Sequence, residues 1–386
     1  MTPSPSASPL RLFAYPFRIF FLSTGIWAVM AILLWVGQLS GLWLLPLNGS
    51  PLLWHRHEML FGLINPAIAG FLLTAVCVWT QTERLHGWPL AGLWLVWLCG
   101  RLLWFSGDVL PEGVVTAVNL LFLPLVILDA GRRILRVRQV RQYPVLGVLA
   151  ALWISQFALL VQPSVVVPEV VMTLLLMLML IIGGRITPAF SDNWLKQQGQ
   201  TPASLTLPLL ERALLPLMGL LALSFILLPS ATPLLAATAA VVTLVRVVLW
   251  KGWCTRTEPL LWSLHLGMLW IPVALFLLAG GSAGWWNPLA WLHAAGAGAA
   301  ASLILAVMTR VSLGHTGRPL HLPSGLALAY KALFGAAVLR VLAALGSVPY
   351  LASLTLAASL WCSAFVLFLL RYTLILCQPR PDGRDG

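Results

Sequence analysis

The sequence predicts an all-α integral membrane protein, a bundle of about 12 transmembrane helices. The 386 residues are 60% hydrophobic and only 9% charged, whereas soluble domains are about half apolar and about a quarter charged. Apolar stretches of roughly 20 residues, enough for a helix to cross a ~30 Å hydrocarbon core, recur along the whole chain. Many of the 19 tryptophans stand near the ends of these stretches, where indole rings favour the boundary between lipid and water.

No soluble domain interrupts the predicted spans, so we expect a single polytopic membrane domain over residues 1–386. Short cytoplasmic tails are expected at 1–16 and 377–386, and the longest connections at 187–205 and 310–324. The start of the chain lacks the pattern of a signal peptide, so the first span should remain as an anchor. The predicted spans are 17–42, 54–79, 88–106, 110–131, 144–162, 168–186, 206–228, 232–251, 258–280, 286–309, 325–345 and 349–376.

The distribution of basic residues predicts the orientation of these spans. When the spans alternate from a cytoplasmic N-terminus, most basic residues fall on the cytoplasmic side, including the cluster at 132–141. This is the positive-inside bias, and it predicts that both termini are cytoplasmic. The net charge of +12 then reflects topology, so we expect the lipid bilayer as a partner and no nucleic acid. The exceptions, which lean towards the outer side, are Arg56, Arg101 and Arg340.

Histidines carry more chemical information than cysteines in this chain. The five cysteines are scattered without a Cys-x-x-Cys pair, so a disulfide framework, a thiolate zinc site and covalent haem attachment are not expected. Imidazole is a common ligand of haem iron and copper. A single intramembrane histidine more often hydrogen-bonds a neighbouring helix, and several together favour a ligand site.

The segment WHRHEMLFG (54–62) opens the second span with an unusual set of polar groups. His55 and His57 point about 200° apart on a regular helix, so they share a site only if this turn is irregular, or if one binds while the other supports it. His55 and Met59 share a face, and imidazole with a thioether suits copper or haem. Glu58 could balance a metal's charge, move protons, or pair with Arg56.

The tenth span supplies a third histidine, His293, followed by the small-residue stretch AAGAGAAAS (294–302). Such a surface admits a close helix neighbour or a flat macrocycle. If the second and tenth spans touch, His293 would meet the two histidines of WHRHEMLFG near the outer side. His265 and His315 form a possible second pair on the inner side.

Three arginines near the inner side are candidates for binding anionic groups. Arg185 lies in IIGGRITPAF (181–190), whose glycines and proline predict the end of the sixth span, and Arg310 and Arg318 flank His315. Arginine suits bidentate contacts with carboxylates, so these residues could hold haem propionates, an anionic lipid or a substrate. Positive-inside anchoring together with a helix stop is the alternative, and the sequence favours it slightly.

These segments together resemble the NnrS family of bacterial membrane proteins. The resemblance rests on WHRHEMLFG with IAGFLLTAVCVWT (68–80), on GGRITPAF (183–190), on LWSLHLGMLWIP (261–272), and on WLHAAGAGAA through MTRVSLGHTGR (291–318). One position departs from the family pattern, because Val78 stands where an asparagine commonly precedes the Trp-Thr pair. The matching histidines are His55, His57, His265, His293 and His315.

The resemblance implies a protein of the bacterial inner membrane that binds haem b and copper. It also implies a role in nitric oxide metabolism, denitrification or tolerance of nitrosative stress. No nicotinamide or flavin fingerprint occurs, so electrons would come from a quinol or a protein donor. Under this hypothesis the protein is either a nitric oxide-related oxidoreductase or a relay or assembly factor that carries the cofactor without turnover.

A transporter of a small molecule or metal, without a permanent redox cofactor, is the alternative. Twelve spans are typical of transporters by analogy of fold. Pro66, Pro124 and Pro272 stand inside predicted spans, and broken helices often surround transport sites. No convincing inverted repeat relates the two halves of the sequence.

Overall fold

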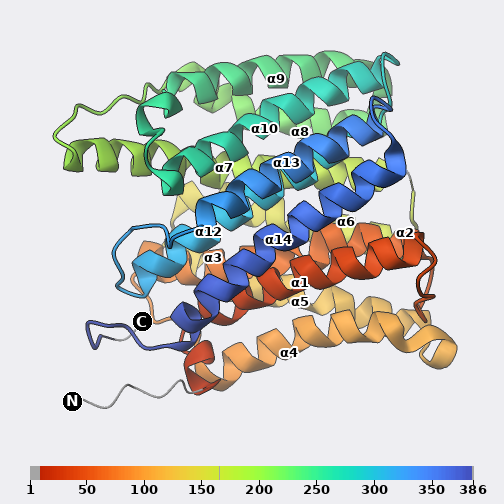
Figure 1. Ribbon diagram of the computed structural model, residues 1–386, viewed down its shortest axis with the longest axis horizontal. Helices are drawn as coiled ribbons and strands as arrows, with labels where there is room; N and C mark the ends of the chain where they lie inside the picture. Colours follow the sequence, from red (N-terminus) through yellow and green to blue (C-terminus); the bar gives the residue numbers. More distant parts are fainter. Residues whose placement is uncertain (1–8, 165, 385–386) are drawn as a thin grey trace. The chain divides into compact units, whose positions relative to one another are not determined.

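A computed structural model of the protein describes residues 9–164 and 166–384. This part of the chain is helical and contains no strand (Figure 1). It includes 12 helical stretches long and apolar enough to cross a membrane, which confirms the predicted fold class. Residues 1–8 of the expected N-terminal tail and 385–386 of the C-terminal tail lie outside the described residues.

The spans consist of fourteen α-helices, two π-helical segments and short 3₁₀ turns in the described residues. The α-helices are α1 (Pro16–Leu39), α2 (Pro51–His57), α3 (Ile64–Thr80), α4 (Gly87–Leu103), α5 (Glu112–Arg136), α6 (Tyr143–Val161), α7 (Val166–Gln197), α8 (Pro208–Leu227), α9 (Thr232–Leu249), α10 (Pro259–Ser282), α11 (Ala290–His293), α12 (Ala301–His315), α13 (Leu326–Ala344) and α14 (Tyr350–Cys377). The π-helical segments are η2 (Glu58–Gly62), between α2 and α3, and η7 (Ala294–Ala300), between α11 and α12. The 3₁₀ turns are Pro9–Phe13, Trp104–Val109, Val140–Gln142, Pro229–Ala231 and Gly252–Thr255.

The prediction that glycines end the sixth span was wrong. Helix α7 continues through Gly183, Gly184 and Pro188 to Gln197. A Cβ on Gly183 would lie 2.5 Å from the sulfur of Met268, and one on Gly184 would collide with the Arg246 guanidinium. The two glycines therefore permit close packing along a continuous helix.

The chain divides into two compact units. Unit 1 comprises Met1–Ser164, Met308–Leu326 and Phe365–Gly386, and unit 2 comprises Val165–Val307 and Ala327–Ala364. The expectation of a single membrane domain stays a prediction.

In unit 1, the start of α1 is joined to the end of α14. The fully buried Arg18 donates through Nη1 to the carbonyl oxygens of Leu376 and Gln378, the latter at 2.9 Å. Gly25 of α1 faces the side chains of Phe368 and Leu369, and Figure 1 shows the two helices side by side there. The two ends therefore lie at the same end of unit 1, as the charge pattern requires. The side of the membrane that they face stays a prediction.

The second span starts at a well-defined cap and changes its pitch after one short helix. The Ser50 side chain accepts a hydrogen bond from the Leu53 amide, and Pro51 occupies the first turn, where a missing N–H costs nothing. After His57 the backbone widens into η2 and then returns to the α-helix α3. Segments of π-helix are rare and frequently mark functional sites.

In unit 2, the small residues of the tenth span are used for close helix packing. Helix α10 packs against α9 and η7. Gly298 lies so close to the Trp270 ring that a Cβ would collide with it, and Gly267 faces the Leu303 side chain in the same way. AAGAGAAAS was expected to admit either a close helix neighbour or a flat macrocycle, and the structure shows a close helix neighbour.

Candidate functional site

A buried ion pair lies where the second span enters unit 1. Arg101 Nε of α4 is 2.8 Å from Glu58 Oε2, and Glu58 Oε1 is 2.8 Å from His57 Nδ1. Glu58 and His57 are 0% exposed and Arg101 is 3% exposed. A charge inside a membrane costs at least ~2.5 kcal/mol on insertion scales, so each charged group here requires the other.

Two amide side chains complete this network. Arg101 Nη2 donates to Asn119 Oδ1 of α5. The Gln156 Nε2 group of α6 donates to the Asn119 carbonyl oxygen at 3.1 Å and lies 3.0 Å from His57 Nε2. Three further helices, α4, α5 and α6, thus converge on the first turns of the second span.

The network fixes the tautomer of His57. A carboxylate paired with arginine can only accept hydrogen bonds, so His57 Nδ1 carries the proton that Glu58 accepts. Gln156 Nε2 is a donor, and its bond to the Asn119 carbonyl oxygen fixes which end of the amide faces the imidazole. His57 Nε2 therefore presents a lone pair.

Close packing surrounds the ion pair. A Cβ on Gly62 would collide with Glu58 Oε2, so only glycine leaves space for the carboxylate. Trp97 Nε1 donates to the Gly62 carbonyl oxygen at 3.0 Å. The narrow space lined by Asn65, Trp97, Asn119 and Gln156 has no room for a water molecule. The network is thus enclosed by closely packed protein groups.

Of the roles expected for Glu58, ion pairing is observed, with Arg101 in place of Arg56. Sequence reasoning missed Arg101, Asn119 and Gln156. One available signal was that Arg101 is an isolated charge inside an apolar span, which needs a buried acidic partner at a similar depth. The amides gave no comparable signal, because their positions depend on how α5 and α6 pack.

The remaining site residues of unit 1 lie apart from this network. His55 stacks on Trp35, with ring centroids 4.0 Å apart and planes inclined by 7°. Met59 is half-buried. The His315 ring lies 5.6 Å from the Phe17 ring, and its carbonyl oxygen accepts from Arg380 Nη1 at 3.1 Å.

The two site histidines of unit 2 occupy different environments. His265 Nε2 lies 2.8 Å from Ser191 Oγ, and a Cβ on Gly252 would lie 2.5 Å from its Nδ1 atom. His293 is half-buried at the end of α11, directly before η7. Both predicted groupings, of His293 with the WHRHEMLFG histidines and of His265 with His315, join residues of different units, so they stay predictions.

Within the two described ranges, no three or more His, Cys, Asp or Glu side chains form a group that could hold a metal ion. A centre assembled entirely from such ligands is therefore not preformed in this part of the chain.

Comparison with known families agrees with the sequence. The family model described as NnrS protein matches residues 11–380 of the chain, nearly its whole length. The chain belongs to the NnrS family. None of the curated proteins compared with it is similar.

In this NnrS chain the three candidate arginines are all half-buried. Arg318 Nη2 lies 3.4 Å from Gln378 Oε1, and burial lowers the pKa of its guanidinium. Arg185 and Arg310 lie in different units, so a shared anion site for the arginines stays a prediction.

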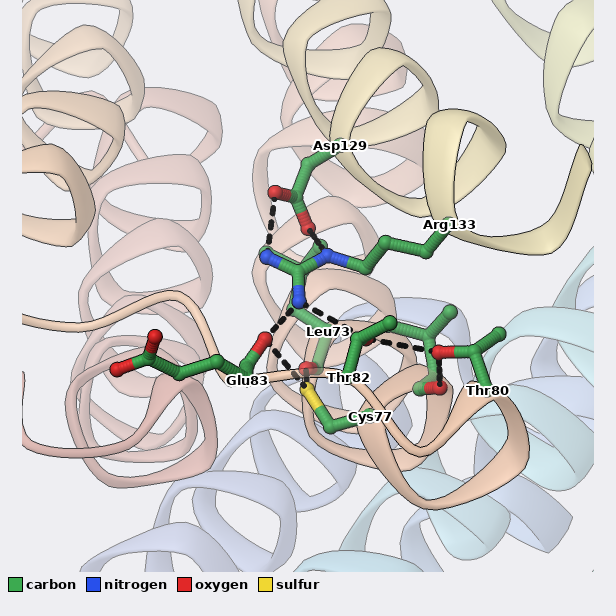
Figure 2. A network of polar contacts seen from close by, with 8 residues as sticks. Leu73, Cys77, Thr80, Thr82, Glu83, Asp129 and Arg133 are labelled. Carbon is green, nitrogen blue, oxygen red and sulfur yellow. Dashed lines mark hydrogen bonds and ion pairs between the residues drawn. The ribbon is translucent and has the colours of Figure 1, made fainter. Parts of the chain in front are cut away.

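A second polar cluster of this NnrS chain, the Arg133 cluster, ties a loop to α5 (Figure 2). Arg133 binds Asp129 through two contacts of 3.0 and 2.9 Å. Its Nη1 donates to Thr82 Oγ1 at 3.1 Å and to the Glu83 carbonyl oxygen. The Cys77 thiol lies in the last turn of α3, 3.9 Å from that carbonyl oxygen. These bonds connect the α3–α4 connection to α5, which indicates a structural role.

Proposed function

We propose that this protein is an inner-membrane haem protein, with copper as a second metal, that acts in nitric oxide metabolism or in tolerance of nitrosative stress. Membership of the NnrS family and the membrane-spanning fold support this function. The main observation in its favour concerns His57. The Glu58–Arg101 pair orients this imidazole within a predicted membrane span so that its Nε2 atom presents a lone pair.

A histidine that binds a metal almost always donates its other ring N–H to a carboxylate, a carbonyl oxygen or water. His57 has this arrangement on its Nδ1 side. Arg101 holds the Glu58 carboxylate in place, and the carboxylate in turn orients the imidazole ring. A buried structural histidine also needs an acceptor for its N–H group, so the removal of His57, described below, is needed to separate the two roles.

The Nε2 side of His57 shows what a bound group would displace. Gln156 donates to Nε2, while Gln156 Oε1 is buried and has no hydrogen-bond partner in the described part of the chain. Binding at His57 would therefore require Gln156 to move and the surrounding helices to separate, because His57 is fully buried and the packing beside Gln156 leaves no open space. The movement would also allow the Gln156 carbonyl group to find a donor.

The candidate ligands within either unit suit haem better than copper. Haem needs only one or two protein ligands, whereas no group of three candidate ligands is present in the described residues. We propose His57 as one haem ligand. The candidates for the other ligand and for copper are His55, His265, His293, His315 and Met59, and Arg185, Arg310 and Arg318 are the candidates for the propionates.

Haem iron would supply the direct binding of nitric oxide, with electrons from a quinol or a protein donor if the protein is an oxidoreductase. The protein's own residues orient the imidazole and exclude water from its surroundings.

The test is the absorption spectrum of the purified protein, oxidised and reduced, with and without nitric oxide, together with metal analysis. We expect a Soret band that shifts with nitric oxide. His57→Ala should lower haem content at least fivefold, and Glu58→Gln should shift the spectrum because the imidazole loses its carboxylate partner. His86→Ala is the control, because His86 lies in an exposed loop beside Glu83.

A colourless wild-type protein, after expression with ample haem and copper, would contradict the haem proposal. Full haem retention in His57→Ala would contradict only the assignment of the ligand. Transport is less well supported, because α5 and α10 continue through Pro124 and Pro272. Uptake by vesicles containing colourless protein would favour it.

A further inference from the structure

The first and ninth spans share several features, in the same order and at the same spacing. Helices α1 and α10 each contain 24 residues and have a proline in the first turn. Trp27 and Trp270 stand at the same distance from Pro16 and Pro259. Each Trp Nε1 is buried and has no hydrogen-bond partner among the described residues.

The second and tenth spans match in the same way. Both open with a proline followed three residues later by a tryptophan, in PLLW (51–54) and PLAW (288–291). Both tryptophans are buried, and each short helix passes into a π-helical segment. Each segment places a glycine against the tryptophan of the preceding span, because a Cβ on Gly62 would meet Trp27 and one on Gly298 would meet Trp270.

The third and eleventh spans extend the correspondence. Arg101 and Arg340 stand at the same distance from the first residues of α4 and α13. An aromatic ring of each helix packs on one of the two matching tryptophans. The ring centroids of Trp97 and Trp27 are 6.3 Å apart, and those of Phe334 and Trp270 are 5.6 Å apart. From these matches we infer an internal repeat, with α1–α4 as the first copy, in unit 1, and α10–α13 as the second copy, most of it in unit 2.

The two copies differ at the carboxylate that pairs with the arginine. Counting from Trp54 and Trp291, the position of Glu58 in the first copy is occupied by Ala295 in the second. The second copy thus keeps the arginine and lacks the carboxylate. Arg340 contacts Tyr350 through its hydroxyl group and lies 5.6 Å from the ring centroid, while its Nη1 atom is buried without a hydrogen bond in the described residues.

We propose that Arg340 binds the phosphate of an anionic phospholipid, which supplies the negative charge that Glu58 supplies to Arg101 in the first copy. Arginine prefers bidentate contacts with phosphate, and an arginine near a helix end reaches towards lipid headgroups. Arg340 is half-buried one turn before the end of α13, close to the predicted outer boundary. The exposed Tyr350 and Leu351 beside this helix end suit the acyl chains and the interface. The proposal is independent of haem.

Native mass spectrometry of the full-length protein, purified from membranes with added phosphatidylglycerol, tests the proposal. Wild-type protein should retain one phosphatidylglycerol per chain, and Arg340→Gln should lower its occupancy at least tenfold. Arg212→Gln is the matched control, since it removes the same charge from an exposed position of unit 2, and its occupancy should equal that of the wild type.

Two further measurements, on a second variant and with inorganic phosphate, complete the test. If Arg340→Gln does not fold, Arg340→Lys should still lower occupancy at least threefold, because an ammonium group cannot make the bidentate contact. Wild-type occupancy in a folded Arg340 variant would overturn the proposal. Delipidated wild-type protein should not bind inorganic phosphate, and binding that depends on Arg340 would identify a free anion and overturn the lipid assignment.

Discussion

A glycine determines where the buried charge of unit 1 can lie. Gly62 has no side chain, and the Glu58 carboxylate occupies the space that a Cβ would need. The carboxylate there contacts Arg101 on one oxygen and His57 on the other. Breaking a buried pair of this kind costs about 3–5 kcal/mol, because the remaining charge has no partner.

Gly62→Ala should therefore destabilise the protein. The methyl group would collide with Glu58 Oε2 and lie 3.0 Å from Trp27 Nε1, and overpacking costs about 1–3 kcal/mol. The free energy of unfolding, measured by titration with denaturing detergent, should fall by that amount. Gly92→Ala is the control, because nothing lies within 4 Å of its Cβ position. Equal stability of the two variants would show that the carboxylate does not occupy this space.

At this scale the sequence predicted which residues matter better than which residues meet. The composition of WHRHEMLFG singled out His57 and Glu58 because polar groups are rare in such a chain. Arg101, the partner of Glu58, lies 43 residues further along the chain, and Gln156, the partner of His57, lies 99 residues further. No periodicity within one helix encodes such contacts, since they depend on the rotation of each helix about its axis.

Helices in this protein are held to one another by loops as well as by apolar packing. The Arg133 cluster holds the α3–α4 connection against α5. Its two charged side chains are 17% and 23% exposed, so the ion pair is partly screened and contributes less than a buried pair.

Arg133→Gln should loosen this connection without unfolding the helices. It removes the contacts to Asp129 and to the Glu83 carbonyl oxygen, and each such hydrogen bond contributes about 1 kcal/mol. Amide exchange over residues 81–86 should rise roughly fivefold, as expected for a loss of about 1 kcal/mol. Arg136→Gln removes a charge from an exposed position of the same helix and should leave exchange unchanged. Unchanged exchange in Arg133→Gln would contradict the tie.

The elements themselves were largely predictable, because length and hydropathy determine a membrane span. All twelve predicted spans have a counterpart in the structure. The π-helical segments were not predictable from hydropathy, since one widened turn barely changes an apolar pattern. The extension of α7 was missed for a different reason: glycines permit close packing as well as chain breaks, and a sequence alone does not distinguish these uses.

Across the whole molecule, the charge pattern makes a firm prediction of topology. Alkaline phosphatase requires disulfides that form outside the cytoplasm, so a fusion after Gly386 should be inactive. The same enzyme inserted in the connection after α1, between Leu39 and Pro51, should be active. The reverse pattern would place both termini outside and contradict the predicted orientation.

The duplication also has a meaning at this scale. Strict alternation of the predicted spans predicts the same direction across the membrane for the first and ninth spans, which contain α1 and α10. The repeat is therefore parallel, and a search for inverted repeats does not find it. One copy retains the internal ion pair, while the other replaces the acid with Ala295.

Arg18 imposes an order on biosynthesis. The ribosome makes this residue within the first span, but the carbonyl oxygens that it binds belong to Leu376 and Gln378. All of unit 2 is translated between these two parts of unit 1. The first helix must therefore wait in the membrane, with its guanidinium in some temporary contact, until α14 has been inserted. Completion of unit 1 is therefore a late event, because the carbonyl oxygens that bind Arg18 belong to residues among the last to be translated.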